Sequence, residues 1–317
     1  MKTKYFNIFL LTFVLAGFGF SCTDDNSIDD SYPIVGLGGD DYPKNYIDEW
    51  LYEQFTVPYN IEVKYRWNPY DYDISLPFVP PYEENVIPVM ELIRDVWINT
   101  YKDLMGEEFI RKYAPKNYAL VGNVKITSSG SRVTGEAEGG NRVTIYRVNW
   151  WNPNDHTNAD EDKRFENLVP LMLKTVHHEF THTLNQIVKY PEEFIRITPE
   201  YRLDEWATLY YQGDDAVRDA GFISAYASCN PAEDFAEIVS LILVKGQTWF
   251  DTRVAMANST VKLPGSEYTA QEALRLKETI VVSYLKNSWG IDLYGTDEQP
   301  GLEKLVQQAM KNYLDTH

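Results

Sequence analysis

The most constraining feature of this chain is the stretch His178-Glu179-Phe180-Thr181-His182, which lies inside a helical pattern of apolar residues. Residues four apart on an α-helix lie above one another on one face, so two imidazoles at this spacing can bind a single metal ion. The Glu beside the first His lies at the edge of such a site, where its carboxylate can take a proton from water and pass it to a leaving amine. The pattern H-E-x-x-H thus predicts a zinc (Zn²⁺) centre for hydrolysis, with His178 and His182 as metal ligands and Glu179 as the catalytic base.

The opposite side of the predicted helix has the pattern of a surface that packs on a core. Apolar residues recur there at intervals of three and four: Val169, Leu173, Val176, Phe180, Leu184 and Ile187. His178 and His182 fall roughly opposite this stripe and are therefore expected to face a cleft. The alternative is a surface helix that carries a pair of His by chance, and the amphipathic pattern favours the metal site.

A zinc ion held by two His needs a third protein ligand, and a carboxylate is a common choice. Asn230 is a good N-cap and Pro231 fits the first helical position, so a second buried helix is expected to begin here and to end at Gly246. Glu233 is the candidate third ligand, although at its position an acidic side chain often completes a capping box instead. Glu237, one turn further on the same face, would accept a hydrogen bond from the other ring nitrogen of a ligand His.

The second helix also carries a resemblance to a known group of enzymes. The stretch Glu233-Asp234-Phe235-Ala236-Glu237 is similar to the second glutamate motif of gluzincins, in which the first Glu is a zinc ligand. The pattern is most similar to that of the anthrax lethal factor-like peptidases, which have a Tyr seven residues before that Glu. Tyr226 occupies this position here. The resemblance implies that its hydroxyl stabilises the oxyanion of the tetrahedral intermediate.

Two departures from related patterns bear on the ligand set. Asn185 and Val188 replace the Gly and His of the longer metzincin motif, which excludes that group. The separation of His182 from Glu233 is longer than in thermolysin-like enzymes, so other carboxylates remain alternative third ligands. These are Asp204, Glu205 and Glu237.

Residues 1–21 have the pattern of an export signal, because Lys2 and Lys4 precede an apolar run that is too short to cross a membrane. Cys22 follows, so this start resembles a bacterial lipoprotein signal peptide in which Cys22 becomes the lipid-bearing first residue of the mature chain. Ordinary secretion, with cleavage near Ser21, is the alternative. The lipid on Cys22 would be the only attachment of the chain to a membrane.

Residues 22–41 are acidic and contain several Gly, so they cannot bury enough apolar surface to order themselves and are predicted to be a flexible tether. The acidic stretch resembles the signal that sends Bacteroidetes lipoproteins to the outer face of the outer membrane. We therefore expect an outer membrane lipoprotein exposed at the cell surface, with the periplasmic face as the alternative. Since Cys22 is assigned to the lipid, Cys229 has no disulfide partner and is expected to be a small buried hydrophobic residue.

The charge of the chain limits the classes of partner. The formal net charge is −18 at pH 7, which argues against nucleic acid and against attraction to anionic lipid through a basic patch. The motif instead predicts a peptide or protein substrate, and we expect a monomer.

Together, the motifs and the lipoprotein start resemble the zinc-binding metallopeptidase lipoproteins of Bacteroidetes that are associated with TonB-dependent substrate import. This resemblance implies a zinc metallopeptidase at the cell envelope, with outer-membrane TonB-dependent importer components as partners. Two alternatives remain open. One is an inactive accessory lipoprotein that binds peptide or glycan for such an importer, and the other is a zinc amidase or esterase acting on glycan or peptidoglycan fragments.

The expected fold is α+β: a zincin-like catalytic domain with a small mixed sheet, an H-E-x-x-H helix and a mostly helical C-terminal part. Residues 42–125 would form the N-terminal α+β part of the catalytic unit, and residues 126–317 the zincin core and C-terminal helices. Residues 143–148 are the candidate edge strand that would hold a peptide by β-augmentation. Helices are predicted at 45–55, 88–104, 249–258, 269–289 and 302–314, and strands at 60–67, 119–126, 132–134 and 142–150.

Overall fold

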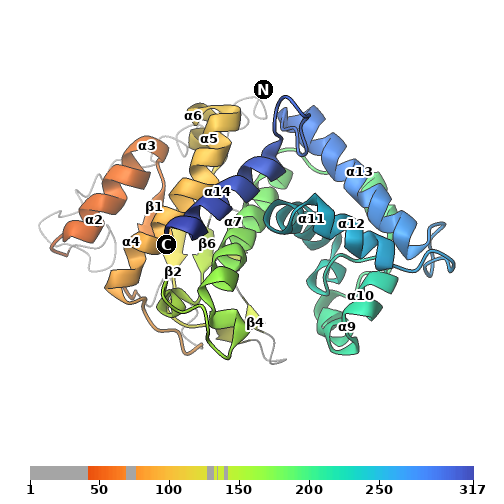
Figure 1. Ribbon diagram of the computed structural model, residues 1–317, viewed down its shortest axis with the longest axis horizontal. Coiled ribbons are helices and arrows are strands. Elements are labelled where there is room, and N and C mark those ends of the chain that lie inside the picture. Colours follow the sequence, from red (N-terminus) through yellow and green to blue (C-terminus); the bar gives the residue numbers. More distant parts are fainter. Residues whose placement is uncertain (1–41, 69–75, 127–131, 134, 139–141) are drawn as a thin grey trace, which may run out of the picture. The chain divides into compact units, whose positions relative to one another are not determined.

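Two long helices form the centre of the fold in the computed structural model: α7 (Phe165–Ile187), which carries the H-E-x-x-H motif, and α11 (Pro231–Lys245). They lie side by side and pack against each other (Figure 1). The structure describes residues 42–68, 76–126, 132–133, 135–138 and 142–317. Asn45–His317 form one compact unit, which contains every helix and strand described below. The predicted signal peptide, the tether and Cys22 lie outside the described residues.

A small mixed sheet lies on the N-terminal side of α7 in sequence. Its order is β1-β2-β6-β5, in which β1, β2 and β6 run parallel and β5 runs antiparallel to β6. A separate antiparallel pair joins β3 to β4. The strands are β1 (Glu62–Lys64), β2 (Asn117–Leu120), β3 (Lys125–Ile126), β4 (Arg132–Val133), β5 (Gly135–Glu138) and β6 (Arg142–Ile145). The predicted α+β class, with a small mixed sheet and a mostly helical remainder, is confirmed.

The prediction that residues 143–148 form the edge strand is wrong. β6 lies between β2 and β5, because residues 135–138 turn back and take the hydrogen bonds on its outer side. After Ile145 the chain leaves the sheet, with Arg147 in the left-handed region (φ +70) and a 3₁₀ turn at Val148–Trp150. β5 is therefore the edge strand on this side of the sheet.

Two helical stretches belong to the N-terminal part of the unit, one before β1 and one between β1 and β2. Asn45 caps α2 (Tyr46–Leu51) through a capping box with Asp48, and the helix continues through a π-helical stretch into α3 (Val57–Tyr59). A longer helix runs from α4 (Glu83–Leu92) through a second π-helical stretch into α5 (Asn99–Met105), followed by α6 (Glu107–Tyr113). The helix predicted at 45–55 is present. The helix predicted at 88–104 is also present, but it begins five residues earlier, at Glu83, so that Pro88 lies inside it.

Aromatic side chains from this part hold the motif helix in place. Phe180, the central residue of the motif, makes edge-to-face contacts with Trp97 and Tyr101 at ring-centroid distances of 5.3 and 5.1 Å. Phe109 meets the same ring at 6.1 Å. Such pairs stabilise a core beyond the burial of their area. The predicted apolar stripe on α7 is buried except for Ile187, which is 54% exposed at the end of the helix.

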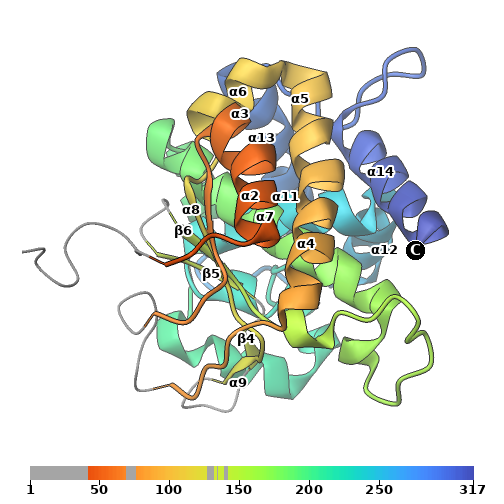
Figure 2. The same cartoon turned by 90° about the vertical axis from the view of Figure 1, so that its left-hand side faces the viewer.

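The C-terminal part of the unit is helical. The helices predicted at 249–258, 269–289 and 302–314 are present as α12, α13 and α14, and all three pack on α11 (Figures 1 and 2). Across the described residues, no helix is long and apolar enough to span a membrane. The bounds are α8 (Glu192–Ile197), α9 (Trp206–Gln212), α10 (Asp214–Asp219), α12 (Gln247–Met256), α13 (Ala270–Trp289) and α14 (Leu302–Thr316).

Candidate metal centre

The motif helix brings its two His side chains together. His178 and His182 lie one turn apart on α7, and their Nε2 atoms are 3.1 Å from each other. His178 is buried, while His182 is partly open to solvent. The Nε2 atoms of both rings face the start of α11, which supplies the next residue of the cluster.

Glu233 completes the cluster from α11. Its Oε2 atom lies 2.9 Å from Nε2 of His178 and 3.2 Å from Nε2 of His182. Asn230 caps the helix, because its side-chain oxygen accepts from the backbone N–H groups of Ala232 and Glu233. The carboxylate of Glu233 does not bond back to the cap. It is left to the two imidazoles, so the capping-box alternative does not describe its side chain.

The donor set and its spacing fit zinc. In a tetrahedral site with bonds of about 2.0 Å, ligand atoms are about 3.3 Å apart, close to the separations of 2.9, 3.1 and 3.2 Å found here. Two imidazoles and one carboxylate are a ligand set of catalytic zinc sites. Among the residues that the structure describes, no fourth His, Cys, Asp or Glu joins the cluster. Three protein ligands would leave a coordination position for water or substrate.

Glu237 holds the ring of His178 from its other side. Its Oε1 atom lies 2.9 Å from Nδ1 of His178 and pairs with Lys174, while Ser224 donates a hydrogen bond to its Oε2 at 2.7 Å. Burial raises the pKa of Glu237, but Lys174 and His178 outweigh it and lower the pKa to about 2. A carboxylate with so low a pKa is ionised at neutral pH, and its contact with Nδ1 leaves Nε2 of His178 to face the cluster.

The charges of the cluster are strongly coupled. Burial opposes a proton on His178, yet the carboxylates of Glu233 and Glu237 raise its pKa to about 9. In turn, burial opposes ionisation of Glu233, but the two imidazoles hold the pKa of its carboxyl well below the usual range. The carboxylates of Glu233 and Glu237 therefore concentrate negative charge around the two imidazoles, which favours a positive charge at this place.

Glu179 is buried beside the cluster without belonging to it. Burial raises the pKa of its carboxyl, while His178 and His182 oppose the rise. A carboxylate with a raised pKa is a better proton acceptor at neutral pH than an exposed one. The position next to His178 on the same helix supplies a base at the edge of the site.

Tyr226 approaches the cluster from a separate segment, the 3₁₀ turn Tyr226–Ser228. Its ring centroid is 6.0 Å from that of His178, and its side chain is 37% exposed. Burial and the negative charge of Glu233 raise the pKa of its hydroxyl, so it stays protonated and able to donate a hydrogen bond. Trp206 packs edge-to-face on the Tyr226 ring at 5.1 Å and limits its movement.

The chain is similar to known proteins over most of its length. A family model described as "Putative zinc-binding metallo-peptidase" matches residues 40–294. The chain belongs to this family. A crystal structure of a protein from Bacteroides caccae, itself described as a "putative zinc-binding metallo-peptidase", matches with a TM-score of 0.59 and 23% sequence identity. The match covers 85% of this chain and 91% of that one, and at this identity it shows the fold. None of the curated proteins matches.

For this zinc-binding metallo-peptidase family member, the alternative third ligands lie outside the cluster. Asp204 and Glu205 belong to an exposed 3₁₀ turn and are not grouped with the two His. Glu237 contacts the other side of His178.

Cys229 is a free thiol and only half-buried, so the expectation of a buried residue is wrong. It lies between the 3₁₀ turn Tyr226–Ser228 and Asn230, the N-cap of α11, and partial burial raises the pKa of its thiol.

Three side chains around the centre were not anticipated from the sequence. Lys174 lies one turn before His178 on α7, a spacing that could have indicated it as a partner of Glu237. Ser224 and Trp206 come from loops and helices far along the chain, and their contacts depend on how those segments pack. No local pattern marks either of them.

Proposed function

We propose that this protein is an active zinc metallopeptidase that cleaves peptide bonds. The single observation that carries the proposal is the cluster of His178, His182 and Glu233, with the buried carboxylate of Glu179 beside it. Its membership of a zinc-binding metallo-peptidase family supports the same chemistry. A three-ligand site with an adjacent base is the arrangement of catalytic rather than structural zinc.

The chain's own residues divide the work as follows. His178, His182 and Glu233 would hold zinc, which when bound supplies a Lewis acid that acidifies water and polarises a carbonyl. Glu179 would accept a proton from the attacking water on its carboxylate and deliver it to the leaving amine. Tyr226 would donate its hydroxyl proton in a hydrogen bond to the developing oxyanion. Glu237 would keep the His178 ring oriented through Nδ1.

The metal content of the purified chain from residue 42 onward tests the ligand set. We expect one zinc per chain in the wild type and its loss in His182→Ala and in Glu233→Ala, because each removes one of three ligands. Glu205→Ala, which removes an exposed carboxylate outside the cluster, should keep the metal. Elemental mass spectrometry gives the ratio directly. Zinc that survives Glu233→Ala would move the third ligand elsewhere, and a wild type that binds none would end the proposal.

Tyr226→Phe is expected to lower kcat about 10²–10³-fold, the usual effect of removing one oxyanion donor, with little change in KM or zinc content. The ring contacts with His178 and Trp206 remain in this variant, so only the hydroxyl is lost. Tyr210→Phe is the matched control, because Tyr210 is exposed on α9. Steady-state kinetics on a cleaved peptide measure both parameters. Wild-type kcat in Tyr226→Phe would remove this residue from the mechanism.

The bond that is cleaved is tested by substrate screening. Zinc-loaded protein should cleave members of a peptide library read by mass spectrometry, and a chelator should stop the cleavage. Cleavage confined to N-acetylated sugars or peptidoglycan fragments would identify an amidase or esterase instead. Binding of peptide or glycan without turnover in either set would identify an accessory binding protein.

We further propose that the chain is an outer membrane lipoprotein anchored through Cys22, facing the cell surface and working with TonB-dependent importer components in nutrient import. The pattern of residues 1–41 supports this proposal. In its own organism the wild type should incorporate a labelled fatty acid and Cys22→Ala should not, while Cys229→Ala keeps the label. Label in Cys22→Ala would contradict the anchor. Protease treatment of intact cells then separates the outer face from the periplasmic face.

A further inference from the structure

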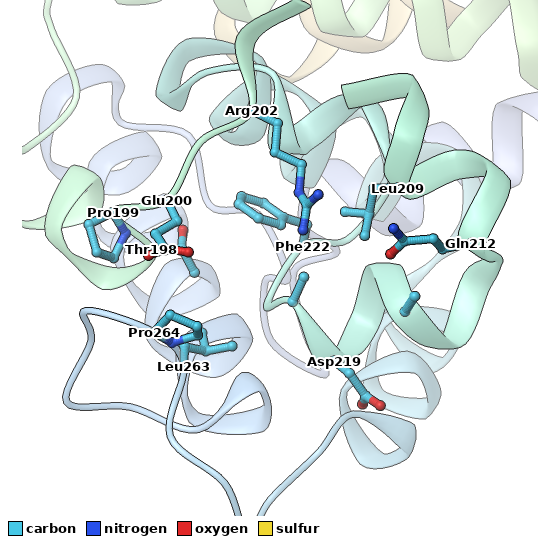
Figure 3. A pocket seen from close by; sticks show the side chains of 12 residues that line it. Thr198, Pro199, Glu200, Arg202, Leu209, Gln212, Asp219, Phe222, Leu263 and Pro264 are labelled. Carbon is cyan, nitrogen blue, oxygen red and sulfur yellow. The ribbon is translucent and has the colours of Figure 1, made fainter. Parts of the chain in front are cut away.

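A cavity of about 300 Å³ lies apart from the metal cluster, between the segment that follows α8, the helices α9 and α10, and the loop before α13 (Figure 3). None of His178, Glu179, His182 or Glu233 lines it. Its volume is at the lower end of the range for small-molecule sites, which suits a ligand of about one or two amino-acid residues.

Arg202 is the only cationic residue that lines this cavity, and among the described residues its guanidinium has no hydrogen-bond or ion-pair partner. Figure 3 shows its side chain extending over the cavity, with Phe222 and Leu209 on either side. Its backbone is fixed, because its N–H donates to the carbonyl of Ser228 at 2.7 Å. The side chain is half-buried, so it is held at the cavity rather than released into solvent.

The lack of a partner is unusual in so acidic a chain. Arg218 and Arg253, from the neighbouring helices α10 and α12, both pair with Asp214. Glu200 and Asp219 line the same cavity as Arg202, yet neither pairs with it. Asp219 instead accepts the backbone N–H of Asn258 at 2.9 Å. The cavity thus holds one unpaired guanidinium although carboxylates are close enough to share its lining.

The rest of the wall is largely apolar. Leu209, Phe222 and Leu263 are all buried and line the cavity. Ala216 and Ala220 also line it, and their small side chains leave space for a ligand. A guanidinium fork matches a carboxylate through two parallel hydrogen bonds, and apolar walls favour a hydrocarbon group. Glu200 and Asp219 would repel a second negative charge.

We propose that this cavity binds a small monocarboxylate that bears an apolar group, of the kind found at the C-terminal residue of a peptide, with its carboxylate on Arg202. This site is separate from the proposed peptidase centre and does not depend on it. Because a free carboxylate could also coordinate zinc, the binding must be measured on protein from which metal has been removed.

The probe is N-acetyl-leucine, compared with N-acetyl-leucinamide, which has the same apolar group without the charge. By calorimetry on chelator-treated full-length mature chain, we expect saturable binding of the acid and binding of the amide weaker by about tenfold or more. Arg202→Gln should weaken binding of the acid by a similar factor, and Arg202→Lys should weaken it by less. Arg196→Gln is the matched control, because Arg196 is an exposed arginine on α8 outside the cavity and should bind like the wild type.

A second variant tests the location without changing charge. Ala216→Phe should fill the cavity and abolish binding of the acid, and thermal unfolding must show that it remains folded. Should it unfold, Ala220→Val makes the same test with a smaller side chain. The proposal would be overturned by equal binding of acid and amide, or by full binding in Arg202→Gln or in the folded cavity variant. It would also be overturned by binding that requires zinc, or by no binding at millimolar concentration.

Discussion

Glu179→Gln is expected to lower the rate of peptide hydrolysis by about 10²–10⁴-fold, the usual contribution of a general base, while leaving one zinc per chain. Glutamine has the shape of glutamate but cannot accept and return a proton. Glu179 contributes no atom to the cluster of His178, His182 and Glu233, so its replacement should not disturb metal binding. The variant removes the carboxyl group whose pKa burial raises, and with it the proton acceptor beside the cluster.

Turnover of a peptide found in the library screen and elemental mass spectrometry on the same sample test this expectation together. Glu166→Gln is the matched control on the same helix, because Glu166 lies near His156 at the start of α7, away from the cluster. Activity in Glu179→Gln within a factor of a few of the wild type would show that another group moves the proton. Loss of zinc would mean that Glu179 helps to hold the metal, which would reassign the centre.

The parts of this centre that could be predicted are those written in local periodicity. The helical repeat predicts that His178 and His182 share one face, and the N-cap signal of Asn230 predicts a helix that carries Glu233 in its first turn. Their meeting at 2.9–3.2 Å depends on how α7 packs on α11, which the resemblance to gluzincins implied and the structure shows geometrically.

The parts that could not be predicted are pairings between distant segments. The short strand β5 has no strong pattern of its own, and its pairing with β6 removed the expected edge. Ser224 reaches Glu237 only because the loop before Tyr226 folds over α11. Likewise, no local rule places Lys277 of α13 against Asp234, the residue after the candidate zinc ligand. Such contacts are set by tertiary packing, on which single-residue propensities have little influence.

Lys277→Met is expected to lower the free energy of unfolding by about 3–5 kcal/mol, the usual cost of leaving a buried charge without its partner. The ammonium of Lys277 lies 2.6 Å from Oδ2 of Asp234, and both side chains are 0% exposed. Lys277 also donates to the carbonyl of Gly221 at 2.9 Å and lies 4.4 Å from the centre of the Phe222 ring. Among the described residues, the variant leaves Asp234 with the hydroxyl of Tyr201, at 2.9 Å, as its one remaining side-chain donor.

Urea unfolding of three variants separates the charge effect from lost packing. Lys277→Met/Asp234→Leu should regain much of the loss, because apolar side chains replace a buried pair at little cost. Lys286 also lies on α13 and makes an exposed pair with Asp292, beyond the end of the helix, so Lys286→Met should change stability by less than about 1 kcal/mol. A double variant no more stable than Lys277→Met would show that packing, and not the unpaired charge, causes the loss.

The pH dependence of the stability of Lys277→Met is an independent test of whether an ionised Asp234 causes the loss. Burial raises the pKa of Asp234, and Lys277 opposes that rise. Without Lys277 the pKa should rise further, so the carboxyl takes up a proton and becomes neutral at a higher pH than in the wild type. A folded-state pKa raised above the unfolded value means stability that is present at low pH and lost as pH rises through the folded pKa. The difference from wild type should therefore shrink as pH falls, and a difference that does not vary with pH would exclude an ionised Asp234 as its cause.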